Sequence, residues 1–131
     1  MATLQCEIVT PEKRLYAEAA DFVVLPAAEG EMGVLPKHEP VVATLNAGSV
    51  RVTPEGAKEP IRYLVLGGYA QVDGEQVIVL ADRAIAVDDI DKEACMAELE
   101  GLKAKLDGMA DDDPNRAFIE SEVKWNELLL A

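Results

Sequence analysis

The sequence is short of the residues from which most catalytic and metal sites are built. It contains one histidine, His38, and two cysteines, Cys6 and Cys95, among 131 residues. A single histidine cannot complete a typical zinc site, and the two cysteines are too far apart for a metal-binding spacing. We therefore expect no metal ion and no cofactor. Cys6 lies in an alternating segment and Cys95 on an apolar helical stripe, so both are expected to be reduced, buried thiols.

Aromatic and basic residues are also scarce. Aromatic residues make up 5% of the chain, and 25 acidic residues face 12 basic ones, which gives a formal net charge of −13. Val, Leu, Ile and Ala must then build the core, which suits strands better than a ligand pocket lined with rings. The shortage of Lys and Arg argues against unaided binding to nucleic acid or an anionic lipid surface. A protein or a cation is the expected partner.

Long apolar runs are missing too. No run approaches the roughly 20 residues that span a bilayer. The segment from Met1 to Gln5 leads directly into strand-like alternation, without a signal peptide or an Arg-rich transit segment. The chain is therefore expected to be cytoplasmic, without direct membrane insertion, so that any membrane association comes through partners.

In the first two thirds of the chain, apolar and polar residues alternate with a period of two. Leu4, Cys6 and Ile8 alternate with polar residues, and similar short runs separated by turns follow to about Val87. Many short strands at this spacing predict an antiparallel β-sandwich or barrel. Phe22–Leu25 and Val77–Leu80 do not alternate, which predicts strands buried on both faces. The further expected strands cover residues 14–18, 21–25, 41–45, 49–53, 61–66, 69–72, 75–80 and 83–87.

Around Asp88 the spacing of the apolar residues changes from two to between three and four, which is typical of a helix. We therefore place the domain boundary there, with residues 1–87 as the sandwich and residues 88–131 as a helical hairpin. Gly108 is a plausible stop for the first helix, and Asp113-Pro114 a start for the second, which runs to near Ala131. A narrow apolar seam is expected to pair the helices antiparallel. On the first helix it comprises Cys95, Leu99, Leu102, Leu106 and Met109, and on the second Phe118, Ser121, Trp125 and Leu128.

The segment from Gly30 to Pro40 combines turn residues with the lone histidine. Gly30 and Gly33 can take a positive φ, whereas Pro36 and Pro40 fix φ and lack an N–H, so the composition favours one defined loop over a strand or a helix. An ordinary connection between strands and a contact loop both fit. His38 beside Glu39 lacks the second positioned group of an acid–base site, which favours a structural or interface histidine.

Three further motifs have structural interpretations. Asp111–Asp113 lacks the alternation and central glycine of a calcium loop, so a solvated linker with an N-cap is favoured. Gly67-Gly68 lacks the lysine and spacing of a phosphate loop, and close backbone packing at a strand junction explains it. Asp82-Arg83 fits a surface pair beside the last strand.

Several motifs also occur in a fixed order across the chain. They are Val9-Thr10-Pro11-Glu12, Gly30-Glu31-x-Gly33-x-Leu35-Pro36-x-His38-x-Pro40, Leu45 with Gly48, Gly67-Gly68-Tyr69, Val79-Leu80-Ala81-Asp82 and Asp88-Asp89-Ile90-Asp91. In this order, over nearly the whole chain, they resemble the epsilon subunit of bacterial F-type ATP synthases. The resemblance implies a non-catalytic subunit of the central stalk, peripheral on the cytoplasmic face of the bacterial cell membrane as part of the complex.

The resemblance also implies roles for named residues. A loop over Glu29, Gly30, Glu31, Met32 and Gly33 is similar to the one that touches the ring of c subunits, and His38, Glu39 and Pro40 lie near the gamma subunit. The sandwich would clamp gamma to the c ring. The C-terminal hairpin, with Leu99, Leu102, Leu106, Phe118, Trp125 and Leu128, would restrain ATP hydrolysis by extending along gamma toward the alpha and beta subunits.

Two departures from the family pattern affect the hairpin. Some members bind ATP through an Ile-Asp-x-x-Arg-Ala motif, which here begins Ile90-Asp91 but has Ala94 in place of the arginine, so the guanidinium that would grip phosphate is missing. Residues 88–131 carry 13 acidic and 5 basic residues, a net −8, which opposes docking on an acidic surface. A nucleotide-binding sensor is the alternative function, and a small sandwich enzyme has no convergent polar cluster to support it.

Overall fold

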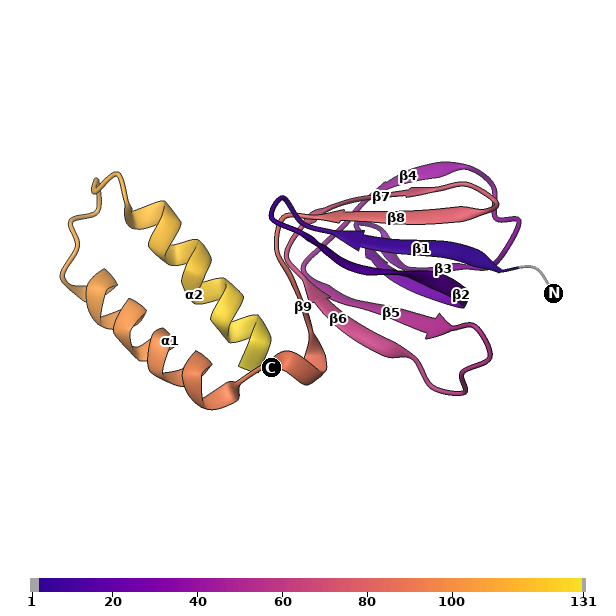
Figure 1. The fold of residues 1–131 in the computed structure, drawn as a ribbon. Coiled ribbons are helices and arrows are strands. Elements are labelled where there is room, and N and C mark those ends of the chain that lie inside the picture. Colours follow the sequence, from indigo (N-terminus) through magenta and orange to yellow (C-terminus); the bar gives the residue numbers. More distant parts are fainter. Residues whose placement is uncertain (1–2, 131) are drawn as a thin grey trace. The chain divides into compact units, whose positions relative to one another are not determined.

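The computed structural model describes residues 3–130, of which those up to Asp88 form a unit with nine strands (Figure 1). Alternation of apolar and polar residues produces most of these strands, because each then buries one face and hydrates the other. In chain order they are β1 (Leu4–Val9), β2 (Arg14–Ala27), β3 (Gly30–Val34), β4 (Val41–Thr44), β5 (Gly48–Pro54), β6 (Ile61–Val65), β7 (Gly68–Val72), β8 (Gln76–Ala81) and β9 (Ala84–Ala86).

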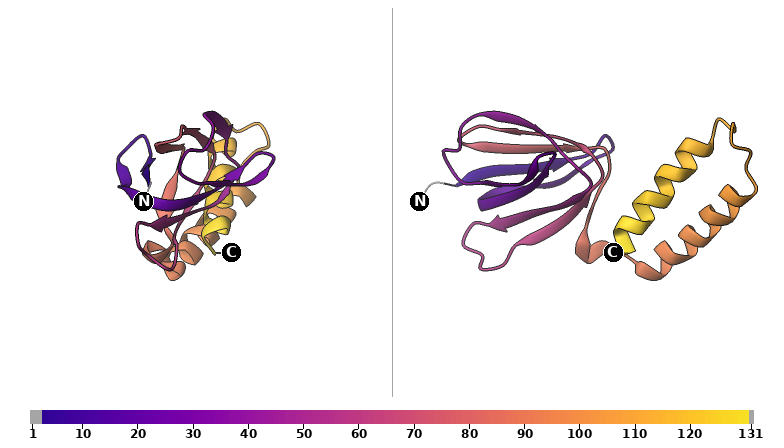
Figure 2. Two further views of the ribbon diagram at one scale, coloured as in Figure 1. Left: turned by 90° about the vertical axis from the view of Figure 1, so that its right-hand side faces the viewer. Right: turned by 180° about the vertical axis from the view of Figure 1, so that it is seen from behind.

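The strands form one sheet that folds over itself into a sandwich, in the order β4-β7-β8-β1-β2-β5-β6-β9, with β3 paired to β2 (Figure 2). The expected sandwich is confirmed. Strand β2 joins the layers because it is 14 residues long: its first half pairs with β1, and its second half pairs with β3 and β5. Within residues 3–130 the pairing of β1 with β8 is parallel and the other ladders are antiparallel, so the sandwich is not purely antiparallel.

One apolar core fills the sandwich, and it draws on every strand from β1 to β8 except β4. The 18 buried residues of this core lie between Leu4 and Ala81. The alternating burial of β1 places Leu4, Cys6 and Ile8 in this core, as their period predicts. The aliphatic bias of the sequence is thus used on the inner faces of the sheet, where β-branched side chains pack well.

Three expectations about strands are wrong. Residues 14–18 and 21–25 belong to one strand, because a shift of register between Ala20 and Phe22 lets β2 continue through the polar residue Asp21. Residues 30–34 form β3 rather than a loop, since their backbone pairs with β2. Phe22–Leu25 is not buried on both faces: Phe22 is 36% exposed and Val24 half-buried, so this segment alternates. In Val77–Leu80, Ile78 and Leu80 are half-buried.

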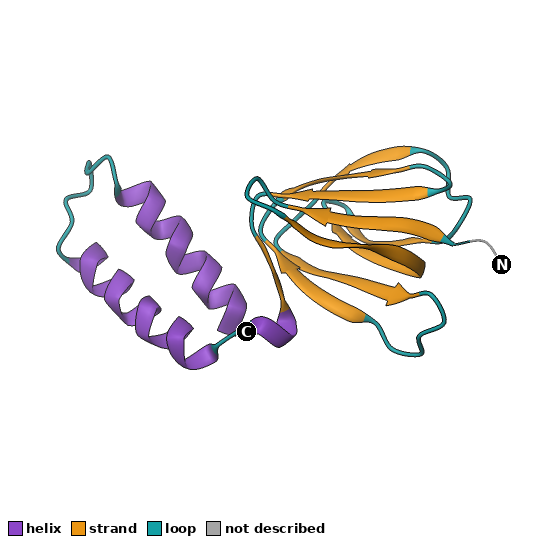
Figure 3. Cartoon of the chain, in the orientation of Figure 1, coloured by secondary structure: helices purple, strands orange, loops and turns teal. Residues whose placement is uncertain are grey.

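The second unit, residues 89–131, holds two antiparallel helices that pack against each other, α1 (Lys92–Asp107) and α2 (Arg116–Leu130), after the short 3₁₀ helix η1 (Val87–Asp89) (Figure 3). Gly108 ends α1 as expected, and its N–H reaches the carbonyls of Leu106 and Lys105. Helix α2 begins at Arg116, two residues later than expected, because Asp113 accepts a hydrogen bond from the N–H of Asn115 (2.8 Å) in a turn before the helix.

The packed face of α2 differs from the expected seam. Phe118 is 63% exposed and Ser121 is exposed, whereas Ile119, Trp125, Asn126 and Leu129 are buried. The face that contains Ile119, Asn126 and Leu129 is rotated by about one residue from the expected one, because the buried asparagine hid this stripe from an apolar pattern. On α1, Cys95 is buried and Leu99, Leu102 and Leu106 are half-buried. Neither helix is long and apolar enough to cross a membrane within the described residues.

Candidate interaction surface

The residues expected to contact the c ring lie on a tight hairpin. Strands β2 and β3 pair from Val23–Val34 to Ala27–Gly30, which leaves Ala28 and Glu29 as the turn. Gly30 has φ 126° and needs to be glycine, because an L side chain rarely adopts this conformation. Gly33 has no positive φ, contrary to expectation. A Cβ there would lie 3.1 Å from the Phe22 ring, so its small size serves packing on the ring.

This turn is held from one side by the last residue of β4 and by the segment that follows it. The N–H of Ala28 donates to the carbonyl of Thr44 (2.8 Å), and the N–H of Asn46 donates to the carbonyl of Pro26 (2.7 Å). The side-chain amide of Asn46 reaches the carbonyls of Ala27 and Ala28 at 3.3 and 3.4 Å. These bonds leave the turn exposed with its backbone fixed. Sequence reasoning missed Asn46, which carries no local signal because its partners lie 18 and 19 residues away.

The other arm of the hairpin carries an ion pair. The Arg51 guanidinium on β5 donates from Nη2 to Oε2 of Glu31 on β3. Both strands pair with β2 at Val24, on its opposite edges, so the pair spans β2. Arg51 was also missed by sequence reasoning, because no periodic signal links it to the turn.

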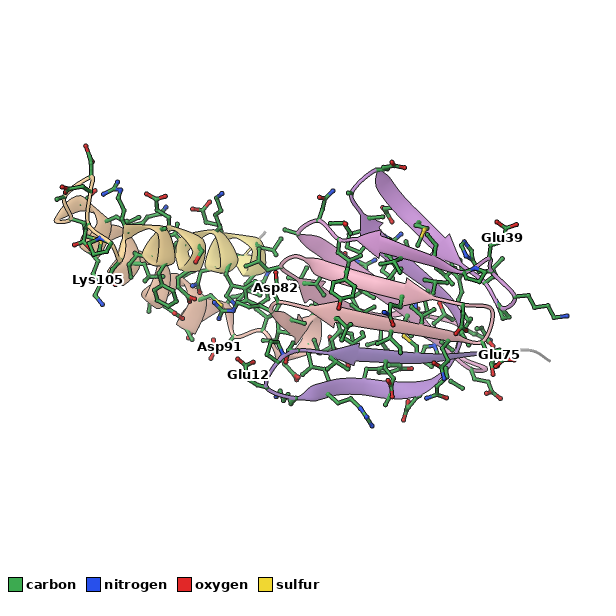
Figure 4. The ribbon with its side chains drawn as sticks, turned by 90° about the horizontal axis from the view of Figure 1, so that it is seen from above. Glu12, Glu39, Glu75, Asp82, Asp91 and Lys105 are labelled. Carbon is green, nitrogen blue, oxygen red and sulfur yellow. The ribbon has the colours of Figure 1, made fainter. Side chains whose placement is uncertain are left out.

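The segment from Leu35 to Pro40 connects β3 to β4 and lies against the β7–β8 turn. Lys37 has φ 71°, and its N–H donates to the carbonyl of Gly74 at 2.8 Å. A Cβ on Gly74 would lie 3.2 Å from Cα of Lys37, so glycine permits the close approach. Glu39 lies at the same end of the sandwich as Glu75 (Figure 4). His38 is half-buried, and its Nδ1–H donates to the carbonyl of Glu39 (2.7 Å), which is a structural contact.

Strand β4 brings these two regions together. It pairs with β7 and ends the sheet, so one of its edges has no strand ladder within residues 3–130. Val41 and Val42 are 37% and 66% exposed on it. Two open grooves of about 390 Å³ each border these valines. One is lined by Ala27, Ala28, Glu29 and Met32, and the other by Pro40 with residues of β7 and β8.

We call this region the β4 surface, meaning Ala28, Glu29, Met32, Pro40, Val41 and Val42. It joins the residues expected at the c ring to a residue expected at gamma. The two valines were missed as site residues, although a consecutive apolar pair in a short strand without alternation was a usable signal. Exposed apolar side chains on an open sheet edge are typical of a surface that another protein covers.

The incomplete nucleotide motif has a structural use in this chain. Asp91 is the N-cap of α1, and its carboxylate accepts a hydrogen bond from the N–H of Ala94 at 3.1 Å (Figure 4 labels Asp91). Ile90 is half-buried, and Ala94 is exposed. The motif residues therefore begin a helix, as Asp at an N-cap commonly does.

Arg116 holds the other end of the hairpin. Its Nη1 donates to the carbonyls of Leu106 and Met109, each at 3.5 Å, and its Nε lies 2.9 Å from the carboxylate of Glu120. A cation at the C-terminus of α1 complements the partial negative charge of the helix end. This guanidinium is thus engaged with protein groups. Among residues 3–130 there is also no group of three His, Cys, Asp or Glu side chains placed to hold a metal ion.

The comparisons with known proteins match most of the chain. The family model described as the ATP synthase delta/epsilon chain β-sandwich domain matches residues 3–87. The ATP synthase epsilon chain of Desulforamulus reducens is 39% identical over 130 residues, which cover 98% of this chain and 97% of that protein. The epsilon chain of Halorhodospira halophila is 40% identical over 112 residues, covering 86% and 79%.

Two solved structures extend the likeness to the fold. A chain in the Euglena gracilis mitochondrial ATP synthase, a structure of OSCP, F1 and c ring, is 28% identical with a TM-score of 0.74; the match covers 98% of this chain and 80% of that one. A chain of the Tetrahymena thermophila mitochondrial ATP synthase central stalk and c ring has a TM-score of 0.55 at 12% identity, and shows the fold alone.

Proposed function

This chain belongs to the family of ATP synthase delta/epsilon chains, and on that premise we propose that it is a non-catalytic rotor subunit that couples rotation of the c ring to ATP synthesis through gamma. The solved relatives in F1 and c-ring assemblies support a place in the central stalk. In a bacterial cell this places the chain on the cytoplasmic face of the membrane, held there by its partners. Its mechanism is mechanical, since it clamps two neighbours together.

The observation that carries the proposal is the exposed apolar edge at β4. Val42 is 66% exposed beside Val41, between two grooves, on a strand that forms a ladder along one edge alone in the described part of the chain. A protein partner that covers this edge gains apolar burial and backbone pairing. We assign gamma to this edge together with His38, Glu39 and Pro40.

The turn of the β2–β3 hairpin is assigned to the c ring. Glu29, Gly30 and Glu31 are exposed, and the backbone of the turn is fixed by Asn46 and Thr44. A fixed turn transmits force with little deformation, as coupling to a rotating ring requires. Met32 and Gly33 follow the turn in β3. Met32 lines the groove beside the turn, and Gly33 packs against the Phe22 ring.

The C-terminal hairpin is assigned a regulatory role, restraining ATP hydrolysis when its helices separate and lie along gamma. The net charge of −8 requires apolar contacts for such docking. Phe118, which is 63% exposed in the packed hairpin, is available for a partner without any rearrangement. Trp125 is buried, and Leu128 and the leucines of α1 are half-buried, so these side chains become fully available when the helices separate.

The experiment compares gamma binding by the Val42→Glu variant with binding by Met96→Glu. Met96 is 57% exposed on α1, so both variants add one negative charge at an exposed apolar position. We expect Val42→Glu to weaken gamma binding by at least about tenfold, because a carboxylate is desolvated at the interface. Met96→Glu is expected to bind like the unchanged chain. Equal binding by all three proteins would remove gamma from the β4 surface.

A further inference from the structure

The face of α2 that meets α1 contains a buried asparagine. Arg116 marks this face, because its guanidinium donates to the carbonyls of Leu106 and Met109 at the end of α1. Ile119, which is buried, and Asn126, which is 2% exposed, follow at steps of three and seven residues, so they lie on one stripe of the helix. Asn126 is therefore a polar residue at a position where the pairing of two helices favours an apolar side chain.

Asn126 lies beside the first half of α1. The two helices run antiparallel, and Arg116 contacts the C-terminal end of α1 (Figure 1). Asn126 comes ten positions after Arg116, which corresponds to about 15 Å along a helix axis. At this level the inward side of α1 presents Cys95, which is buried, and Leu99, which is half-buried. An apolar side chain in place of the amide would thus meet apolar neighbours.

The side-chain amide of Asn126 forms a hydrogen bond within its own helix. Its Nδ2 donates to the carbonyl of Glu122 at 2.9 Å, one turn earlier in α2. This bond depends on α2 alone, so it persists when the helices separate and contributes nothing to holding them together. The same carbonyl accepts the backbone N–H of Asn126 in the regular α-helical pattern. Removing the amide therefore leaves the Glu122 carbonyl with a partner.

We propose that Asn126 weakens the packing of α1 against α2 and so keeps the helical hairpin able to open. Burial of the amide costs hydration in the packed state, and the position forgoes the apolar burial that a leucine would supply. When the helices separate, the amide regains water and keeps its bond to Glu122. Separation therefore costs less than it would with an apolar residue here. The inference rests on the proposed function, in which the separated helices restrain ATP hydrolysis.

Two substitutions test this inference, each with a matched control. Asn126→Leu replaces the buried amide by an apolar side chain, and Asn126→Met does so with a flexible side chain that adapts to the available space. The controls are Ser121→Leu and Ser121→Met. Ser121 is exposed, and its hydroxyl also donates to a carbonyl of α2, that of Phe118 at 2.7 Å. Every change thus replaces an uncharged polar residue of α2 by a good helix former, and only the changes at Asn126 affect a buried position.

The first measurement is amide exchange of residues 95–106 of α1 in the isolated full-length chain. The substitutions lie in α2, so the exchange rates of α1 follow the opening of the hairpin. We expect both Asn126 variants to slow this exchange by at least about fivefold, since a polar residue in a helix seam lowers stability. The Ser121 controls should stay within about twofold of the unchanged chain. Faster or unchanged exchange, or a loss of helical circular dichroism, in both Asn126 variants would overturn the inference.

The second measurement is ATP hydrolysis by the enzyme assembled with each full-length variant. We expect the Asn126 variants to raise hydrolysis toward the rate of the enzyme whose subunit lacks residues 88–131, because the packed hairpin becomes more populated. The Ser121 controls should hydrolyse ATP at the unchanged rate. Lower hydrolysis by the Asn126 variants would mean that this residue acts in the separated helices, against the inference. Slower exchange with unchanged hydrolysis would retain the effect of Asn126 on the hairpin and show that the regulatory role in the proposed function is wrong.

Discussion

Single residues set the close approaches of this sandwich, and Gly68 is the sharpest case. It has φ 109°, and a Cβ at this position would lie 2.1 Å from the carbonyl oxygen of Leu80. The Gly67-Gly68 pair is thus confirmed as close backbone packing. Gly56 has φ 77° with open space around it. A side chain at Gly56 therefore meets backbone strain alone, whereas a side chain at Gly68 meets both backbone strain and a clash.

We predict that Gly68→Ala lowers the free energy of unfolding by about 3 kcal/mol or more, because the positive φ and the contact with Leu80 both oppose a side chain. Gly56→Ala should cost only about 1 kcal/mol, since its penalty comes from the backbone alone. Urea unfolding of the full-length variants measures both. Similar decreases in the free energy of unfolding for the two variants would contradict the prediction, because β7 and β8 would then move apart at Gly68 without an energetic cost.

A second prediction at this scale concerns pH. Burial raises the pKa of the Cys6 thiol from 9.0 to about 12, with a smaller effect of the Glu7 carboxylate. Above pH 9 the unfolded chain therefore loses this proton while the folded chain keeps it, so the free energy of unfolding falls as pH rises from about 9 to about 12. The slope from Cys6 is about 1 kcal/mol per pH unit.

The Cys6→Val variant should be less sensitive to pH between about 9 and 12, which chemical unfolding at a series of pH values measures. Burial also raises the pKa of Tyr16 to about 12. Its hydroxyl is buried without a hydrogen-bond partner among the described residues. Tyr16 therefore also contributes to the pH dependence above pH 10, and the Tyr16→Phe variant measures this contribution separately. Parallel pH curves for Cys6→Val and the unchanged chain would refute the buried-thiol interpretation.

At the scale of elements, the seam of the hairpin decides its stability. Ile119 is 8% exposed and its neighbour Phe118 is 63% exposed. We predict that Ile119→Ala destabilises the α1–α2 pair by about 2 to 4 kcal/mol, and that Phe118→Ala changes it by less than about 0.5 kcal/mol. Amide exchange of residues 92–130 measures the helices, while exchange in β1–β8 should stay unchanged. A larger effect of Phe118→Ala would restore the seam expected from the sequence.

The residues at the start of α1 lead to a prediction about ATP binding. Asp91 caps the helix, Ala94 stands in place of an arginine, and Arg116 is engaged with Leu106, Met109 and Glu120. The net charge of −8 on residues 88–131 also repels an ATP tetra-anion. We predict no saturable ATP binding below millimolar concentrations by calorimetry. A micromolar dissociation constant would favour the sensor function and identify other binding residues.

For the whole molecule, the composition of the core predicts independent folding of the sandwich. Within the described residues, the 18 buried residues of this core lie between Leu4 and Ala81, all in the first unit. We predict that residues 1–87 alone give a cooperative thermal melt and still bind gamma. Circular dichroism and a pull-down with gamma measure these properties. A non-cooperative melt would mean that the helices are required for the sandwich to fold.

The sequence by itself determined the fold class and the order of the two units, a sandwich followed by a helical hairpin. The spacing of apolar residues, two in the first part of the chain and three to four in the second, is a local property of the sequence. It determines which face of each strand or helix is buried. The alternation of β1, the stop at Gly108 and the sandwich followed by two helices could be predicted for this reason. The ordered motifs indicated the family. The contact role of the region around Gly30 stays a prediction, and the loop expected there is strand β3.

Only the tertiary structure decided how these parts meet. The continuity of β2 through Asp21 and the pairing of residues 30–34 as β3 depend on partners distant in the sequence, so a composition rich in glycine misled the local prediction. Asn126 hid the packed face of α2, because a buried amide resembles a polar surface residue in a pattern. Asn46 and Arg51 act on a turn about 20 residues away, and such long-range bonds become visible only when the sheet brings both ends together.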